Sequence, residues 1–140
     1  MYDVKEKSIM ELQAAMEAGE TTSAELVISY MNRIKEINLS GPALNAILEL
    51  NVEAVTVAMA MDRERKLKGK RSNLHGIPVL IKGNIGTADQ MHTSAGSRAL
   101  KDHYAPEDAN LVKQLREAGA VIMGKANLTE MAKFFAVDIK

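Results

Sequence analysis

The 140-residue sequence contains no cysteine and no tryptophan, and aromatic residues make up only 4% of it. The absence of cysteine excludes disulfide bonds, thiolate catalysis and cysteine-ligated metal sites, and it fits a reducing compartment. The formal net charge is zero, which argues against nucleic-acid binding by bulk electrostatic attraction. The longest apolar run, residues 54–61, is too short to cross a membrane, and the opening MYDVKEKS has no apolar core. We therefore expect a cytoplasmic protein that contacts neither nucleic acid nor a membrane.

Helical periodicity alternates with short apolar runs along the chain. Capping boxes at Ser8 and Thr22 predict two amphipathic helices at the start of the sequence. Further helices are predicted over residues 51–67, over 106–118 with Pro106 in the first turn, and from residue 127 through Phe134 and Phe135. The apolar runs at 46–50, 77–81 and 120–123 are typical of short buried strands. This alternation predicts an α/β layered domain.

Three patterns imitate ligand sites, and each has a simpler structural explanation. Residues 119–125 match G-x-x-x-x-G-K, but the four intervening residues favour a strand, and Ala126 stands where a magnesium-binding Ser or Thr is needed. The histidines at 75, 92 and 103 lack the spacing of a helical metal site. The cationic stretch 63–71, RERKLKGKR, is expected to be the solvated C-terminal end of the third helix. We therefore predict no nucleotide, metal or other cofactor.

Lys82 ends the apolar segment LHGIPVLIK, residues 74–82, and a Gly-Asn pair follows it. A lysine at the carboxyl end of a central strand lies where α/β sheets usually place their ligands. Partial desolvation there would lower the pKa of Lys82 and allow the neutral amine to act as a general base. The alternative is a strand-end lysine that reaches into solvent. The residues alone leave both interpretations open.

The segment 74–85 resembles the lysine-bearing segment of the amidase signature family. The resemblance continues through residues 93–97, 106–112 and 119–132 in the family's order and spacing, and it covers essentially residues 5–135. It implies a mixed-sheet α/β fold, no cofactor, and hydrolysis of small-molecule amides through an acyl-enzyme. In that mechanism the lysine aligned with Lys82 accepts a proton from the serine nucleophile through a bridging cis-serine. Residue 83 is glycine where the family usually has aspartate.

In the family, the serine-rich segment that carries the nucleophile lies further downstream, and no serine or threonine follows Thr129 here. Ser94 and Ser97 match an upstream loop of the family instead. The resemblance thus implies that residues 1–140 form a single partial domain, an incomplete amidase-signature-type fold with a layered mixed sheet and flanking helices. We expect it to carry the catalytic lysine, Lys82, and to be inactive alone.

Two other hypotheses stay open. A non-catalytic oligomerising or binding module derived from an amidase would keep the fold without the chemistry. A minimal Ser-Lys hydrolase would use Ser94 or Ser97 with Lys82, and it requires a hydroxyl within about 3 Å of the lysine amine. Because a partial sheet exposes unpaired edges and apolar faces, we expect as partner a second copy in a homo-oligomer or a complementary C-terminal chain.

Overall fold

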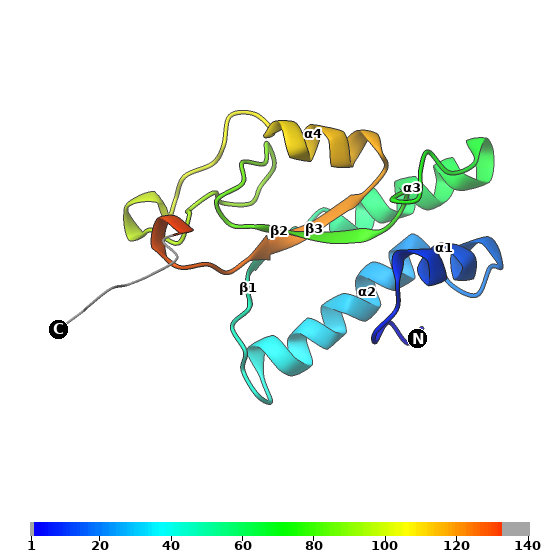
Figure 1. Ribbon diagram of the computed structural model, residues 1–140, viewed down its shortest axis with the longest axis horizontal. Helices are drawn as coiled ribbons and strands as arrows, with labels where there is room; N and C mark the ends of the chain where they lie inside the picture. The colour runs from blue at the N-terminus through cyan, green and yellow to red at the C-terminus, as the bar shows by residue number, and fades with distance from the viewer. Residues whose placement is uncertain (1, 133–140) are drawn as a thin grey trace.

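Figure 1 shows a small twisted sheet with helices on both of its faces, as drawn from a computed structural model that describes residues 2–132. The helices are α1 (Ile9–Glu17), α2 (Ser23–Ile34), α3 (Ala54–Lys68) and α4 (Asn110–Glu117). The strands are β1 (Ile47–Leu50), β2 (Pro78–Lys82) and β3 (Val121–Ala126). A π-helical turn follows α2 at Lys35–Leu39, and 3-10 turns occupy Arg98–Leu100 and Glu130–Ala132. Within residues 2–132, no helix combines the length and apolarity needed to cross a bilayer.

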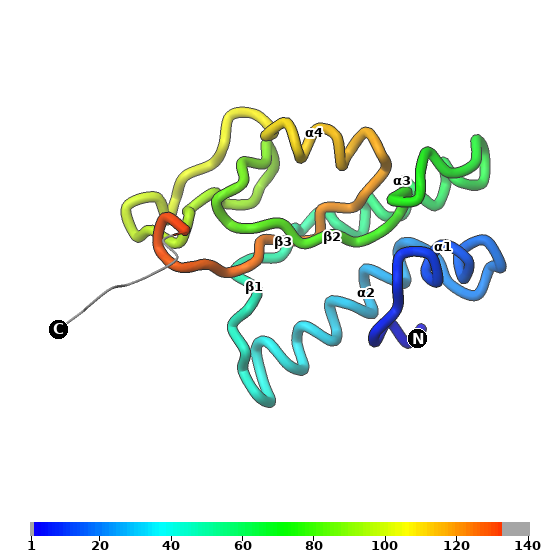
Figure 2. Tube along the Cα trace, viewed as in Figure 1, coloured from blue at the N-terminus to red at the C-terminus, as the bar shows by residue number. Residues whose placement is uncertain are grey.

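The three strands lie in the order β1-β3-β2. β3 pairs antiparallel with β1 and parallel with β2, so the sheet is mixed, as the resemblance implied. A parallel pair needs a long crossover, and here residues 83–120 supply it with a loop and α4. In Figure 2 this loop doubles back several times beside the carboxyl ends of β2 and β3.

Both predicted capping boxes are present. Ser8 Oγ accepts a hydrogen bond from the backbone N–H of Glu11, whose carboxylate accepts one from Ser8 N at 2.8 Å. Thr22 and Glu25 form the same reciprocal pair at the start of α2. Each box satisfies amide donors that the first helical turn leaves free, which explains why these two helix starts were predicted correctly.

The core lies on both faces of the sheet. On one face α2 and α3 pack against β3 through the buried residues Val27, Ile34, Ala54, Ala58, Val121 and Met123. On the other face α4 and the loop before it pack through Ile81, Met91, Val112 and Ile122. Figure 1 shows α4 on the side of the sheet opposite α2. This arrangement confirms the α/β layered fold with flanking helices.

Two predicted helix starts were wrong. Asn51 was expected to be the N-cap of the third helix, but α3 begins at Ala54 with Glu53 as its N-cap, because the Asn51 side chain donates to Ile122 O at 2.9 Å and so ties this residue to β3. α4 begins at Asn110, four residues after Pro106. The intervening segment stays non-helical because it is tied to the preceding loop, where Asp108 Oδ1 accepts a hydrogen bond from Ala88 N at 2.8 Å.

The predicted position of β2 was also wrong. The run at residues 77–81 was expected to be a central strand covered on both faces, but β2 lies at the edge of the described sheet and Leu80 is 36% exposed. Pro78, which has no amide donor, opens this edge strand. Of the helix predicted from residue 127, the described part of the chain contains the turn Glu130–Ala132, and Phe134 and Phe135 lie outside the described residues.

Candidate functional site

A bulge in β3 determines which way its lysine points. Val79 pairs with Ile122, whereas Leu80 pairs with Gly124, so β3 carries one extra residue at this point. In a regular strand, residues three apart, such as Ile122 and Lys125, point to opposite faces. The bulge cancels that alternation and turns Lys125 toward the loop that precedes α4.

Lys125 is buried at that position, with only 1% of its surface exposed. Its Nζ donates to the backbone oxygen of Ile85 at 2.5 Å and to Thr93 Oγ1 at 3.3 Å. Burial lowers the pKa of the Lys125 amine below its ordinary value, while nearby carboxylates, Asp89 first, oppose that shift. From the sequence, this lysine was noted in a false phosphate loop and in the family-like segment 119–132, and it was given no role. The overlooked signal was a single cation inside a strand that is otherwise apolar and small.

Lys82 is the last residue of β2, and its side chain is exposed. Strand alternation places it on the face that carries Leu80, opposite Ile81, whose side chain is buried. Among the described residues no hydroxyl forms a hydrogen bond with Lys82 Nζ. The solvent-reaching orientation is therefore what the structure shows, and the catalytic role of Lys82 stays a prediction.

The two candidate serines are engaged elsewhere. Ser97 Oγ donates to Glu130 Oε1 at 2.9 Å, and Ser94 Oγ accepts from Gly96 N at 3.4 Å. Neither hydroxyl is hydrogen-bonded to Lys82 in the described part of the chain. The minimal Ser-Lys hydrolase thus lacks, within residues 2–132, the contact that it requires.

Gly83, where the family usually has aspartate, lies in a tight space directly after Lys82. Its N–H donates to Ala126 O at 3.0 Å, which joins the ends of β2 and β3. A Cβ on this residue would meet Leu128 Cδ2 at 3.0 Å and Leu48 Cδ1 at 3.1 Å. Any larger residue here requires these leucine side chains to move.

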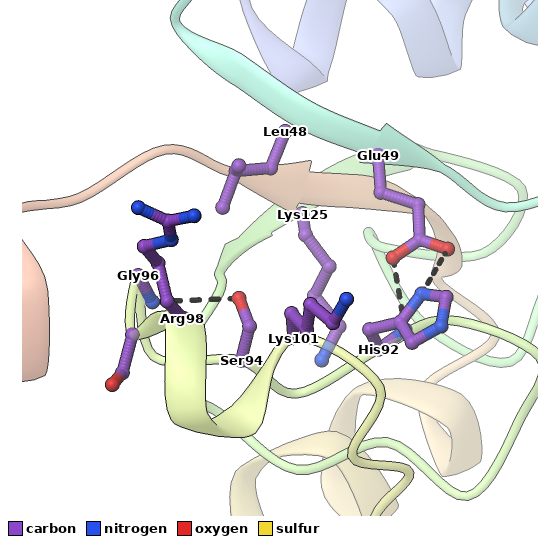
Figure 3. Close-up of a pocket in the computed structure, with 9 residues that line it drawn as sticks. Leu48, Glu49, His92, Ser94, Gly96, Arg98, Lys101 and Lys125 are labelled. Atoms are coloured by element: carbon purple, nitrogen blue, oxygen red, sulfur yellow. Dashed lines mark hydrogen bonds and ion pairs between the residues drawn. The ribbon is translucent and has the colours of Figure 1, made fainter.

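A pocket of about 360 Å³ lies between β1, the end of β3 and the loop at residues 92–101 (Figure 3). Its lining residues are Leu48, Glu49, His92, Ser94, Gly96, Ser97, Arg98, Lys101 and Lys125. In Figure 3 Lys125 reaches down from β3 between Ser94 and His92, and Arg98 and Lys101 stand on the loop below β1. Lys125 lines this pocket and Lys82 does not, so the two lysines lie on different surfaces of the protein.

Glu49 of β1 is held by the loop across the pocket. Its Oε1 lies 3.0 Å from His92 Nδ1, and its Oε2 accepts the backbone N–H of His92 at 2.8 Å. The His92 ring also packs on Tyr104, with ring centroids 4.4 Å apart. Both carboxylate oxygens are therefore occupied, and no local pattern in the sequence indicates this long-range pair.

His75 is buried and hydrogen-bonded through both ring nitrogens. Nδ1 accepts a hydrogen bond from the backbone N–H of Arg71 at 3.3 Å, so it carries no proton itself. Nε2 therefore carries the proton and donates to Met61 O at 2.9 Å. This neutral tautomer leaves no nitrogen free for a metal. Across residues 2–132, no three His, Asp or Glu side chains converge in a geometry suited to a metal ion.

The cationic stretch 63–71 lies at the end of α3 and is mostly exposed, as expected, but two of its arginines are tied to neighbouring segments. Arg65 Nη2 donates to Gln13 Oε1 at 2.7 Å and to His75 O at 2.9 Å, which joins α3 to α1. Arg71 forms a two-pronged ion pair with Glu64. Arg65 thus joins α3 to α1 and to the loop before β2, while Arg71 joins α3 to the end of α4 through Arg116 O at 3.1 Å.

The mixed sheet and its flanking helices match solved amidase structures. The peptide amidase of Stenotrophomonas maltophilia superposes with a TM-score of 0.85 at 48% identity, over 90% of this chain and 26% of that one. An amidase family protein from Bacillus anthracis gives a TM-score of 0.87 at 44% identity, over 91% and 25% of the two chains. The fold is therefore part of an amidase-signature fold.

Sequence comparison leads to the same family. The family model described as Amidase matches residues 25–137, and the chain belongs to this family. An Arabidopsis thaliana protein named as a probable amidase is 42% identical over 140 residues, which is 99% of this chain and 27% of that protein. A glutamyl-tRNA(Gln) amidotransferase subunit from Halorhodospira halophila is 38% identical over 91% of this chain and 25% of its own length. The chain thus spans about a quarter of the length of these relatives.

Proposed function

We propose that residues 1–140 form a single partial domain that supplies the lysine of an amide hydrolase, with Lys82 as the proton acceptor, and that it acts in the cytoplasm. The observation that carries this proposal is the family match over residues 25–137 together with the position of Lys82. The exposed amine stands at the end of β2, open to a group supplied by another segment.

The chemistry assigns a defined task to this amine. A serine hydroxyl attacks an amide carbonyl only if a base removes its proton, and a neutral lysine is such a base. In the family mechanism the proton passes through a bridging serine to the lysine and then to the departing amine, as the C–N bond breaks. Water then hydrolyses the acyl-enzyme. Lys82 supplies one of these three groups, so we expect no turnover from this chain alone.

We propose that a complementary C-terminal chain supplies the other two groups, or that a second copy in a homo-oligomer covers the open sheet without completing the site. An apolar pocket of about 210 Å³ opens between α2, the turn after it and the sheet, with Leu44, Leu80 and Met123 in its lining. Leu44 is 59% exposed beside it. Contiguous apolar surface next to an open strand edge is typical of an interface. Light scattering at micromolar concentration tests this, and a strict monomer argues against the homo-oligomer.

The first experiment measures amide hydrolysis by the chain itself. A panel of glutamine, simple aliphatic amides, aryl amides and peptide amides is incubated with the parent chain and with Lys82→Ala. We expect ammonia release at the buffer rate from both. Turnover by the parent that Lys82→Ala abolishes would show that the chain is a complete catalyst and would contradict the partial-domain proposal.

The second experiment tests Lys82 in a complete enzyme. This chain replaces the matching N-terminal quarter of the Stenotrophomonas maltophilia peptide amidase, to which it is 48% identical. We expect the chimera to hydrolyse a peptide amide and Lys82→Ala to lower kcat at least a thousandfold. Lys68→Ala, which removes an exposed lysine at the end of α3, is the matched control and leaves kcat unchanged. Equal activity of the two variants would refute the role of Lys82.

A further inference from the structure

The pocket beneath β1 carries an excess of positive charge. Three cationic side chains line it, Arg98, Lys101 and Lys125, against the single carboxylate of Glu49. His92 is hydrogen-bonded to both oxygens of that carboxylate, which keeps its negative charge and, like Asp89, opposes the lowering of the Lys125 pKa by burial. The lining therefore keeps a net positive charge, because three cationic groups face one carboxylate.

Lys125 is the residue of this site that the fold holds in a fixed position. It is 1% exposed, yet it contributes to the pocket wall. Its two described hydrogen bonds, to Ile85 O and Thr93 Oγ1, fix the amine in place and use two of the three donors of an ammonium group. A rigid, water-excluded donor interacts more strongly with an anion than an exposed lysine does.

Two further donors on the pocket wall have no acceptor among the described residues. The Arg98 guanidinium is exposed on the 3-10 turn and forms no ion pair within residues 2–132. Ser94 Oγ accepts from Gly96 N, so its own O–H stays available to donate. In the described part of the chain, Lys101 is paired only with its neighbour Asp102, at 3.7 Å on the exposed surface.

We propose that this pocket binds a short aliphatic carboxylate. The arginine fork and the serine hydroxyl match a carboxylate, the buried lysine compensates its charge, and Leu48 provides an apolar wall for its hydrocarbon part. A volume of about 360 Å³ accommodates a small acid of this kind. Binding at this pocket is independent of the proposed amidase reaction, because Lys82 does not line it.

The test is a titration of the isotope-labelled chain with butyrate, followed by two-dimensional amide NMR. We expect shifts confined to residues 48–49, 92–101 and 125, with a dissociation constant on the order of 1 mM for so small a ligand. Butylammonium, which has the same length and the opposite charge, should produce none of these shifts. Scattered shifts, or equal shifts with the two probes, would overturn the proposal.

Substitutions at exposed positions then test the residues without disturbing the fold. Arg98→Gln is expected to weaken butyrate binding at least fivefold, and Ser94→Ala about twofold. Arg63→Gln, which removes an exposed arginine of α3 away from the pocket, is the matched control and leaves binding unchanged. Equal affinities of the Arg98 and Arg63 variants would refute the carboxylate site. An inactive chimera, together with a chain that still binds butyrate, would contradict the proposed amidase function and leave the carboxylate site intact.

Discussion

Two lysines stand at neighbouring positions of the same sheet and have opposite surroundings. Lys125 of β3 pairs with Ile81, and Lys82 of β2 pairs with the next residue, Ala126. Lys125 is buried and donates to Ile85 O and Thr93, whereas Lys82 is exposed. The difference arises from the strand arrangement, because β3 is central and bulged while β2 lies at the edge.

The largest expected effect comes from Gly124→Ala, which would break the arrangement that buries Lys125. An added Cβ would lie 2.5 Å from the backbone oxygen of Glu49, so β1 and β3 would have to separate. We expect a loss of about 3 kcal/mol in the free energy of unfolding, measured by urea denaturation. Gly19→Ala is the control, since its Cβ meets nothing within 4 Å and it costs only the left-handed φ of +72°, about 1 kcal/mol. Equal losses would mean that the close approach of β1 is not essential.

Lys125→Met tests the buried amine while keeping the length of the side chain. The variant leaves Ile85 O without its Nζ donor, and we expect about 2 kcal/mol of destabilisation by urea denaturation. Lys101→Met removes a lysine whose side chain is 74% exposed and should change stability by less than about 0.5 kcal/mol. A Lys125→Met protein as stable as the parent would show that desolvation of the amine cancels its hydrogen bonds.

The pH dependence of stability sharpens the same comparison. Burial lowers the pKa of Lys125 in the folded protein below the ordinary 10.5, so the unfolded chain binds more protons between the two values. The stability of the parent relative to Lys125→Met should therefore rise as the pH increases toward 10.5. Urea denaturation of both proteins from neutral to alkaline pH measures this. A difference that falls with pH would mean that the folded state favours the charged amine.

The smallest expected effect on stability is that of Lys82→Met. The side chain is exposed and forms no described ion pair or hydrogen bond, so the change should be below about 0.5 kcal/mol by urea denaturation. A large effect of replacing Lys82 is expected only on kcat, measured in the chimera with the peptide amidase. A stability loss above about 1 kcal/mol would show that Lys82 holds the fold together instead.

Local signals in the sequence predicted the elements that local interactions determine. The capping boxes at Ser8 and Thr22 are short-range patterns, and both helix starts agree with them. The strand at residues 120–123 was likewise predicted from its apolar run, and it forms β3. The start of α4 was missed because contacts with residues 86 and 88, far along the loop, hold the chain ahead of Asn110 non-helical.

The candidate site depended on long-range contacts that no short pattern reports. Lys82 attracted attention because it follows an apolar run, but Lys125 has an equally apolar context in a strand. Only the bulge opposite Val79 and Leu80 determines that Lys125 points inward. The pair of Glu49 and His92 joins residues 43 positions apart, and neither side chain is unusual in its local sequence.

The order of the strands also governs how the sheet assembles during synthesis. Within the described residues β1 and β2 pair only with β3, and β3 is the last of the three to leave the ribosome. The helices α1, α2 and α3 precede it and contain mostly local hydrogen bonds. A nascent chain that ends before Val121 therefore carries two unpaired strands, the condition that favours aggregation and chaperone binding. The central strand thus joins β1 and β2 into one sheet in a single late step.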